Sequence, residues 1–263
     1  MKYGFIGCGN MGGALATAAA KAVGGANILL ADTDLEKAKT LAQTIGATVS
    51  DADQIATECD YIVLGVKPQG MAKLLQGISL QDDPVLISMA AGLKIETLSS
   101  MLGKKASWIR IMPNTPVAVG EGRILYTTEN ITAEQEETFL NLFAQAGKLY
   151  QLPEHLIDAG TALSGCGPAF VYLFIEALAD GAVTCGIPRE TALELAAGTV
   201  LGAAKNAIES GKHPAELKDA VCSPGGSTIE GVKALEANAF RGAVMEAIEK
   251  SFKKTKELGD TKK

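Results

Sequence analysis

Residues 2–15 read KYGFIGCGNMGGAL, and the pattern of this stretch decides the fold of the first half of the chain. The apolar run 3–6 ends in a glycine-rich turn, and an alanine-rich helical pattern follows up to Val23. A strand, a glycine turn and a helix in this order are typical of a dinucleotide-binding site. The turn is expected to contact the cofactor through Gly7, Cys8, Gly9, Asn10, Met11 and Gly12.

Each glycine of this turn has a separate physical role in the prediction. Gly7 permits the tight turn, Gly9 leaves room for a pyrophosphate, and Gly12 lets the helix lie close to the strand. The first helical N–H groups and the positive end of the helix dipole would then face the phosphates. An ordinary glycine-rich turn of an α/β protein is the alternative interpretation.

The acidic residue after the second expected strand bears on the choice of cofactor. The run 27–31 ends in Asp32, twenty residues after Gly12. A carboxylate at this place accepts hydrogen bonds from the adenosine ribose and would repel the 2′-phosphate of NADP. No arginine follows in the next two positions to bind that phosphate, although lysines come shortly afterwards. The sequence therefore favours NADH and leaves NADPH open.

The composition argues against several classes of protein. The chain has 263 residues, which suits two domains, and 47% hydrophobic residues, which suffices for a substantial core. Its net charge of −6 gives no electrostatic support to nucleic-acid binding. Five scattered cysteines without a CxxC pair, together with two histidines, argue against a disulfide framework and against a metal site.

The sequence predicts neither a signal peptide nor a membrane span. Met1 and Lys2 lead directly into the first expected strand, without an apolar leader. No uninterrupted apolar run reaches the roughly 20 residues that cross a bilayer. We therefore expect a cytoplasmic protein with no membrane partner.

Further apolar runs predict the other strands of a parallel sheet, whose carboxyl ends face the ligand in open α/β folds. The run 61–66 ends in Lys67-Pro68 and the run 84–89 in Ala90-Ala91, so both turns should face the cofactor. Lys67 is either a catalytic or ligand-binding residue or, with equal weight, a lysine that positions its loop. Later strands are expected at 108–112, 123–127 and 148–152, with a stiff irregular loop at 113–116.

The pattern changes at about Ile157, after which helices are expected and no strands. A helix from Pro168 to Cys185 is apolar almost all round, with Glu176 and Asp180 as its charged residues. A helix that is apolar on every face is normally buried, and a domain of this small size would cover it poorly. We therefore expect a second subunit to cover this helix.

A second glycine-rich stretch, 221–230, reads VCSPGGSTIE. Ser227 and Glu230 predict a capping box, with a helix that starts at about Thr228. The preceding Pro-Gly-Gly segment would expose backbone N–H groups at that helix start, an arrangement that binds a carboxylate or a phosphate. Hydroxyl groups of Ser223, Ser227 and Thr228 would line the same point. A well-capped connection between two helices is the equally weighted alternative.

Together the two glycine-rich stretches indicate hydride transfer to a small carboxylic acid. Reduction of a carbonyl needs a strong proton donor such as lysine or histidine. The helix after Gly167 has no lysine before Lys205, and His155 lies at the expected domain junction. An imine is protonated more easily, and a hydroxyl group suffices to hold its nitrogen. The sequence therefore favours reduction of a C=N bond.

These motifs resemble those of the pyrroline-5-carboxylate reductases over residues 1–258. The matching segments are FIGCGNMG at 5–12, VKPQ at 66–69, MAAG at 89–92, MPNTP at 112–116, LSGCGPAF at 163–170 and SPGGSTI at 223–229. The resemblance implies an N-terminal Rossmann domain, 1–156, and an all-helical substrate and dimerisation domain, 157–263. It also implies at least a homodimer. Dimers of this family assemble further, often into decamers. The implied reaction is reduction of 1-pyrroline-5-carboxylate to L-proline by NADH or NADPH, the last step of proline biosynthesis.

The resemblance also assigns roles to individual residues. Thr228 matches the threonine that hydrogen-bonds or protonates the ring nitrogen, and is therefore the expected catalytic residue. The implied substrate contacts are Glu154, Ser223, Gly225, Gly226, Ser227 and Thr228. The implied cofactor contacts outside the first motif are Asp32, Gly65, Val66, Lys67, Pro68, Met89, Ala90 and Ala91. The chain departs from the family at Ala220, where some members have asparagine, and at Asp32, where NADPH-using members often have serine or asparagine.

Two other functions were compatible with parts of the sequence. A 3-hydroxyacid dehydrogenase of similar architecture would need a lysine on the helix after the domain junction, which is missing. A nucleotide-sensing protein without turnover would keep the first glycine motif but would not need the pocket at 223–228.

Overall fold

The computed structural model describes residues 1–80 and 83–260. The chain divides into two compact units. The first unit consists of Met1–Cys166 together with the chain from Ser251 onward, and the second unit is Gly167–Lys250. Each unit is described by itself.

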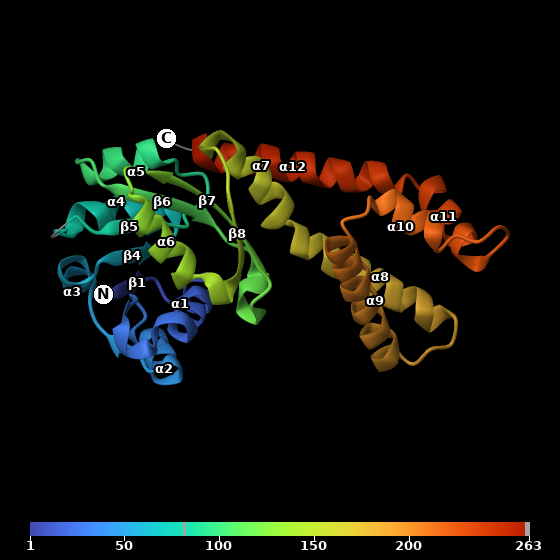
Figure 1. The fold of residues 1–263 in the computed structure, drawn as a ribbon, viewed down its shortest axis with the longest axis horizontal. Helices are drawn as coiled ribbons and strands as arrows, with labels where there is room; N and C mark the ends of the chain where they lie inside the picture. Colours follow the sequence, from blue (N-terminus) through green and yellow to red (C-terminus); the bar gives the residue numbers. More distant parts are fainter. Residues whose placement is uncertain (81–82, 261–263) are drawn as a thin grey trace. The chain divides into compact units, whose positions relative to one another are not determined.

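The first unit is built on an eight-stranded sheet with the order β3-β2-β1-β4-β5-β6-β7-β8 (Figure 1). All neighbouring strands are parallel except β6 and β7, which are antiparallel. The order of the first six strands is that of a doubly wound Rossmann fold, in which β2 and β3 lie on one side of β1 and β4, β5 and β6 lie on the other. The strands are β1 Tyr3–Ile6, β2 Ile28–Ala31, β3 Thr48–Val49, β4 Tyr61–Leu64, β5 Val85–Ser88, β6 Ser107–Met112, β7 Gly122–Glu129 and β8 Gly147–Gln151.

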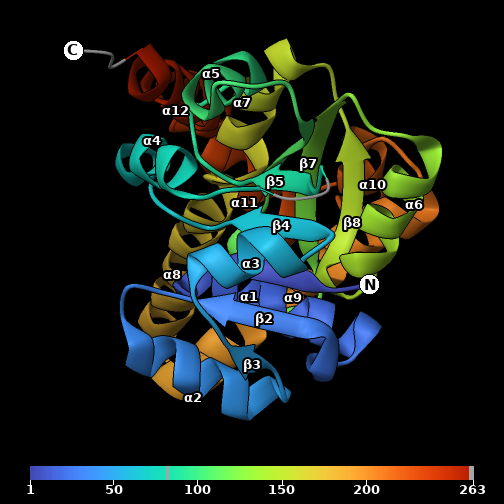
Figure 2. The same ribbon diagram turned by 90° about the vertical axis from the view of Figure 1, so that its left-hand side faces the viewer.

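Helices cover both faces of this sheet, as Figures 1 and 2 show. One apolar core includes residues of α1, α2 and α6, and the other includes residues of α3, α4 and α5. Strands β1, β2, β4 and β5 are buried over their whole length, as expected for parallel strands with helices on both sides. The helices are α1 Asn10–Val23, α2 Leu35–Ile45, α3 Ala52–Glu58, α4 Pro68–Gly77, α5 Ile95–Leu102, α6 Ala133–Leu142 and α7 Glu154–Ser164.

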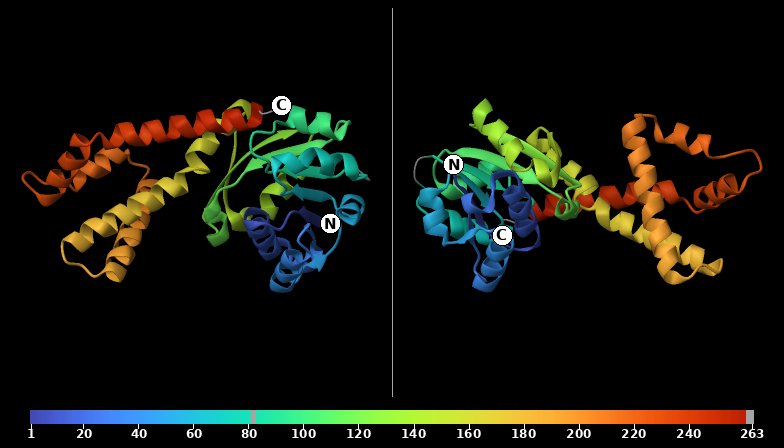
Figure 3. Two further views of the ribbon diagram at one scale, coloured as in Figure 1. Left: turned by 180° about the vertical axis from the view of Figure 1, so that it is seen from behind. Right: turned by 60° about the horizontal axis from the view of Figure 1, so that its bottom comes forward.

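The second unit is all-helical, and α8 and α9 lie against each other in both views of Figure 3. Small side chains at their contact, Ala179, Ala192 and Ala196, allow this close approach. Much of α8 is nevertheless exposed in the single chain: Tyr172 is 60% and Leu173 67% exposed. The helices are α8 Gly167–Thr184, α9 Arg189–Ser210, α10 Pro214–Ala220 and α11 Ser227–Ala237, and α12 Phe240–Asp260 continues into the first unit.

The first compact unit extends past residue 156, where the Rossmann domain was predicted to end. Helix α7 groups with the first unit, because Ile157 packs with Met112 of β6 and Leu125 of β7. The end of α12 also belongs to the first unit, although it follows the whole second unit in sequence. A change from strands to helices along a sequence therefore did not mark the end of the first packed unit.

Local predictions also differ from the structure at two short elements. The segment expected to be irregular after β6 contains a 3₁₀-helix, η2, Thr115–Val119. Pro116 lies in its first turn, where a missing N–H costs nothing. Strand β3 is two residues long and was not predicted, because so short a run has no readable period. Two further 3₁₀-helices are η1 Gly25–Asn27 and η3 Ala144–Ala146.

The stretch from α7 into α8, Glu154–Thr184, is long and apolar enough to cross a membrane by length and composition. Core helices of water-soluble proteins pass the same test. The first part of the stretch carries Glu154 and Asp158, which form ion pairs with Arg110 of the sheet. Those pairs hold α7 against the first unit.

Candidate functional site

The glycine turn between β1 and α1 is shaped by close backbone contacts. Gly7 has a φ of +108°, and a Cβ built on it would lie 2.5 Å from the carbonyl oxygen of Gly65. A Cβ on Gly12 would clash with the carbonyl oxygen of Gly7. Glycine is therefore required at both positions for β1, α1 and the end of β4 to approach one another.

Gly9 differs from its neighbours because a Cβ built there would meet nothing within 4 Å. It is the N-cap of α1, and its lack of a side chain leaves the first N–H groups of the helix without a capping bond. The N–H groups of Asn10, Met11 and Gly12 make no hydrogen bond within the described part of the chain. Open space beside a row of unpaired donors at a helix start fits a pyrophosphate.

Asp32 connects this turn to the turn after β2. One carboxylate oxygen, Oδ2, accepts a hydrogen bond from the Cys8 N–H at 2.6 Å, and Oδ1 accepts one from the Asp34 N–H at 2.8 Å. The two backbone donors hold the carboxylate at the carboxyl end of β2, where a ribose would lie. Burial and the nearby Asp32 raise the pKa of the Cys8 thiol to about 11, so that this thiol stays protonated at neutral pH.

The predicted turns after β4 and β5 follow the next two strands on one side of β1 in the sheet. The Gly65 N–H donates to the Ile6 carbonyl at 2.7 Å, which links the ends of β4 and β1. After β5, the Ala90 N–H donates to the buried Ser88 hydroxyl at 3.3 Å. The structure therefore brings all the predicted cofactor residues to one edge of the sheet. Their individual contacts with a cofactor stay a prediction.

Lys67 occupies the N-cap position of α4, with Pro68 as the first helical residue. Its side chain is exposed and forms no ion pair within the described part of the chain. Both interpretations of this lysine, ligand contact and loop positioning, are therefore retained.

Glu154 is already engaged within the first unit. Its Oε1 accepts a hydrogen bond from the Ile95 N–H at 2.8 Å and lies 3.5 Å from Nη1 of Arg110. Nη2 of Arg110 donates to Asp158 Oδ1 at 2.7 Å. Sequence reasoning missed this cluster. The available signal was a charged residue inside the apolar run 108–112.

The second glycine-rich stretch forms an open helix start, although not in the predicted way. Helix α11 begins at Ser227, its N-cap is Gly226, and no side chain caps it. The predicted capping box of Ser227 and Glu230 is therefore wrong, because Ser227 is already helical and cannot act as the cap. Gly225 has a φ of +68°, and the Gly226 N–H donates to the Ser223 carbonyl at 3.0 Å.

The side chains around this helix start are free to bind a ligand. Ser223, Ser227 and Thr228 are exposed, and their hydroxyl groups make no hydrogen bond within the described part of the chain. No side chain caps α11, so its first N–H groups also lack a side-chain hydrogen bond. This arrangement suits a small carboxylate with a polar group beside it. His213 lies apart from this chemistry, because it serves as the N-cap of α10.

Comparisons with known protein families place both halves of the chain. Residues 154–258 match the family model described as pyrroline-5-carboxylate reductase dimerisation. Residues 2–92 match the model described as NADP oxidoreductase coenzyme F420-dependent.

Named relatives cover nearly the whole chain. The pyrroline-5-carboxylate reductase of Methanosarcina acetivorans is 42% identical, over 98% of each chain. The enzyme of the same name from Escherichia coli is 41% identical, again over 98% of each. Among solved structures, the Plasmodium falciparum pyrroline carboxylate reductase with NADP bound has a TM-score of 0.90 and 35% identity, and the match covers 99% of this chain and 98% of that one.

Proposed function

The chain belongs to the pyrroline-5-carboxylate reductase family, and we propose that it reduces 1-pyrroline-5-carboxylate to L-proline with NAD(P)H, the last step of proline biosynthesis. The observation that carries this proposal is identity of about 41% with the Escherichia coli enzyme over nearly the full length of both chains. The open helix start at α11 and the Rossmann turn at α1 supply the two binding sites that this reaction requires.

A bound reduced nicotinamide supplies the hydride for the imine carbon. The backbone N–H groups at the start of α11, helped by the hydroxyl groups of Ser223 and Ser227, hold the substrate carboxylate. The Thr228 hydroxyl hydrogen-bonds to the ring nitrogen or delivers its proton. The reaction then replaces the C=N double bond by a single bond, with one new C–H bond and one new N–H bond.

We assign the preferred cofactor as NADH, on the basis of Asp32. Two backbone N–H groups fix this carboxylate at the end of β2, so it cannot move away from a 2′-phosphate without losing both bonds. Hydroxyl groups of a ribose can donate to it, whereas a phosphate would be repelled. The Plasmodium falciparum relative is described with NADP bound, so this assignment separates the present chain from a named relative.

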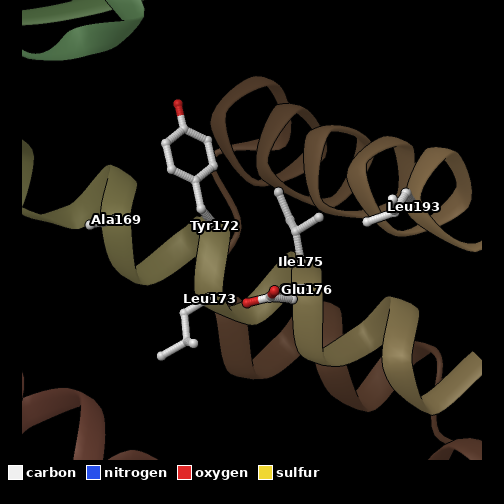
Figure 4. Close-up of a pocket in the computed structure, with 6 residues that line it drawn as sticks. All are labelled: Ala169, Tyr172, Leu173, Ile175, Glu176 and Leu193. Carbon is white, nitrogen blue, oxygen red and sulfur yellow. The ribbon is translucent and has the colours of Figure 1, made fainter.

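We further propose that the protein acts in the cytoplasm as a homodimer or a larger assembly. Figure 4 shows Tyr172 and Leu173 projecting from α8 in different directions. Both side chains line a surface cavity of about 570 Å³. Exposed apolar side chains in such number on a helix that matches a dimerisation model support cover by a second copy. Light scattering should give a particle mass of at least twice the 27.2 kDa of one chain. A monomer at assay concentrations would contradict this proposal.

The function is tested by the oxidation of NADH and of NADPH by the purified protein, with and without pyrroline-5-carboxylate. We expect oxidation that depends on the substrate and is faster with NADH, with proline as the product. Binding of a cofactor without any substrate-dependent oxidation would contradict the proposed reaction and favour the nucleotide-sensing alternative.

A further inference from the structure

A buried polar cluster connects strand β6 to helices α5 and α7 within the first unit. Its centre is Arg110, which is 1% exposed. The guanidinium donates to Asp158 at 2.7 Å, and its Nη1 lies 3.5 Å from a carboxylate oxygen of Glu154. Both carboxylates come from α7, one helical turn apart. Arg110 therefore fixes the first turn of α7 against the sheet.

Glu154 also acts on a second helix. Its Oε1 accepts the N–H of Ile95, the first residue of α5, at 2.8 Å. Lys94, the N-cap of α5, supplies no capping bond of its own. The N-terminus of α5 is thus capped by Glu154, a residue of α7. The orientation of the Glu154 side chain depends on Arg110.

Helix α5 begins shortly after the turn 89–92, whose small residues are expected to let the nicotinamide end of the cofactor approach the backbone. The same turn is supported from a second direction, because Ala91 packs on the cluster of Met112, Leu125 and Ile157. Two residues of α7 therefore support this region: Glu154 contacts the first residue of α5, and Ile157 belongs to the cluster against which Ala91 packs. A displacement of α7 would move this turn.

Joining three elements through a buried charged cluster has a free-energy cost. Nε of Arg110 is buried without a hydrogen-bond partner within the described part of the chain, and Nη1 reaches the Glu154 carboxylate only at an ion-pair distance of 3.5 Å. Burying a charged group with unsatisfied donors costs free energy that an apolar side chain would not. A purely structural contact between a strand and a helix would be stronger with aliphatic residues, so the cost points to a role in geometry.

We propose that Arg110 is a positioning residue: it holds Glu154 on the N-terminus of α5 and thereby fixes the turn 89–92 for the nicotinamide half of the cofactor. The inference rests on the proposed function only for the nature of the cofactor. It also gives Glu154 a different role from direct contact with the substrate.

The test compares two ligands that share the adenosine and pyrophosphate parts. NADH includes the nicotinamide, and ADP-ribose lacks it. Calorimetric Kd values for both are measured with the full-length protein and with Glu154→Ala, Glu154→Gln and Arg110→Lys. The Gln side chain retains the oxygen that accepts the Ile95 N–H. The lysine of Arg110→Lys keeps the positive charge but cannot hold both carboxylates in one plane.

We expect Glu154→Ala and Arg110→Lys to weaken NADH binding about fivefold, the factor that corresponds to one helix cap, while ADP-ribose binds as before. Glu154→Gln should restore NADH binding. Thr132→Ala is the matched control, because it removes the side-chain cap of α6 at the opposite edge of the sheet and should change neither Kd.

Two results would overturn the proposal. Equal weakening of NADH and ADP-ribose would indicate general loosening of the first unit. An unchanged Kd for NADH combined with a raised KM for pyrroline-5-carboxylate in Glu154→Ala would make Glu154 a substrate contact. Failure of the proposed reaction is recognised separately, since the wild-type protein would then bind NADH without oxidising it in the presence of the substrate.

Discussion

The two glycine-rich helix starts, at α1 and at α11, have similar chemistry but differ in how closely the surrounding chain packs against them. Each has a glycine N-cap and no side-chain cap. At α1 the flanking glycines are enclosed by backbone, and the helix buries five of its residues. At α11 a Cβ on Gly225 would meet nothing within 4 Å, and no residue of the helix is buried. The helix start at α1, the enclosed site, is therefore surrounded by its own unit, whereas the helix start at α11, the open site, presents its donors from a helix that its own unit barely covers.

The largest effect is expected from Gly7→Ala, which would break the enclosed site. The new Cβ would lie 2.5 Å from the Gly65 carbonyl oxygen, in a backbone conformation with φ of +108°. Strain and overpacking together should cost about 3 kcal/mol of unfolding free energy. Urea unfolding followed by circular dichroism measures this loss. A loss below that of the equivalent change at Gly225 would contradict the contrast between the two sites.

Thr228→Ala tests the open site by chemistry rather than by stability. The side chain is exposed and makes no hydrogen bond with any residue that the structure describes, so its loss should leave the melting temperature unchanged. Removal of a group that assists proton transfer should lower kcat about 10²-fold. Thr228→Ser, which keeps the hydroxyl, is the control and should retain most of the activity. Unchanged turnover in Thr228→Ala would remove this residue from the mechanism.

Asp32→Ser sharpens the comparison by removing the link between two turns of the enclosed site. Loss of a charged acceptor should raise the Kd for NADH about tenfold and narrow its advantage over NADPH. The matched control is Asp60→Ser at the other edge of the sheet, where Asp60 accepts the Lys2 N–H at 2.7 Å. If Asp32→Ser left the ratio of the two Kd values unchanged, Asp32 would not determine the cofactor.

The smallest effect is expected from Gly225→Ala, the counterpart of Gly7→Ala. Its φ of +68° carries a conformational cost, but the space around it is open. We expect a loss of about 1 kcal/mol in unfolding free energy. The KM for pyrroline-5-carboxylate should rise if the segment binds the substrate. A KM equal to that of the wild type would argue against this segment as the carboxylate site.

The sequence predicted the strand, glycine turn and helix at the start of the first unit because their signals are local. Buried parallel strands appear as uninterrupted apolar runs, and the glycines of a tight turn are visible as letters. The Rossmann and helical architecture was confirmed for the same reason. The predicted cap of α11 was wrong. The actual N-cap, Gly226, has no side chain that could mark it as a cap in the sequence, and the next residue, Ser227, is of a type that commonly caps helices.

The cluster around Arg110 could not be derived from the sequence. Its partners are 44 and 48 positions away along the chain (154 − 110 and 158 − 110), and nothing in a linear pattern pairs an arginine in a strand with a particular carboxylate. The grouping of α7 with the first unit could not be derived from the sequence for the same reason. It depends on the packing of Ile157 against strand residues that precede it by more than thirty positions. Long-range pairing is the part of the fold that required coordinates.

The division of the chain has a consequence for how the protein is made. The second unit is inserted between Cys166 and Ser251 of the first, so the last segment of the first unit leaves the ribosome after the entire second unit. The strands of the Rossmann sheet precede the second unit in the sequence, but the first unit stays incomplete until the segment from Ser251 onward has been made. The helices of the second unit can therefore pack together on a chain whose first unit is still unfinished.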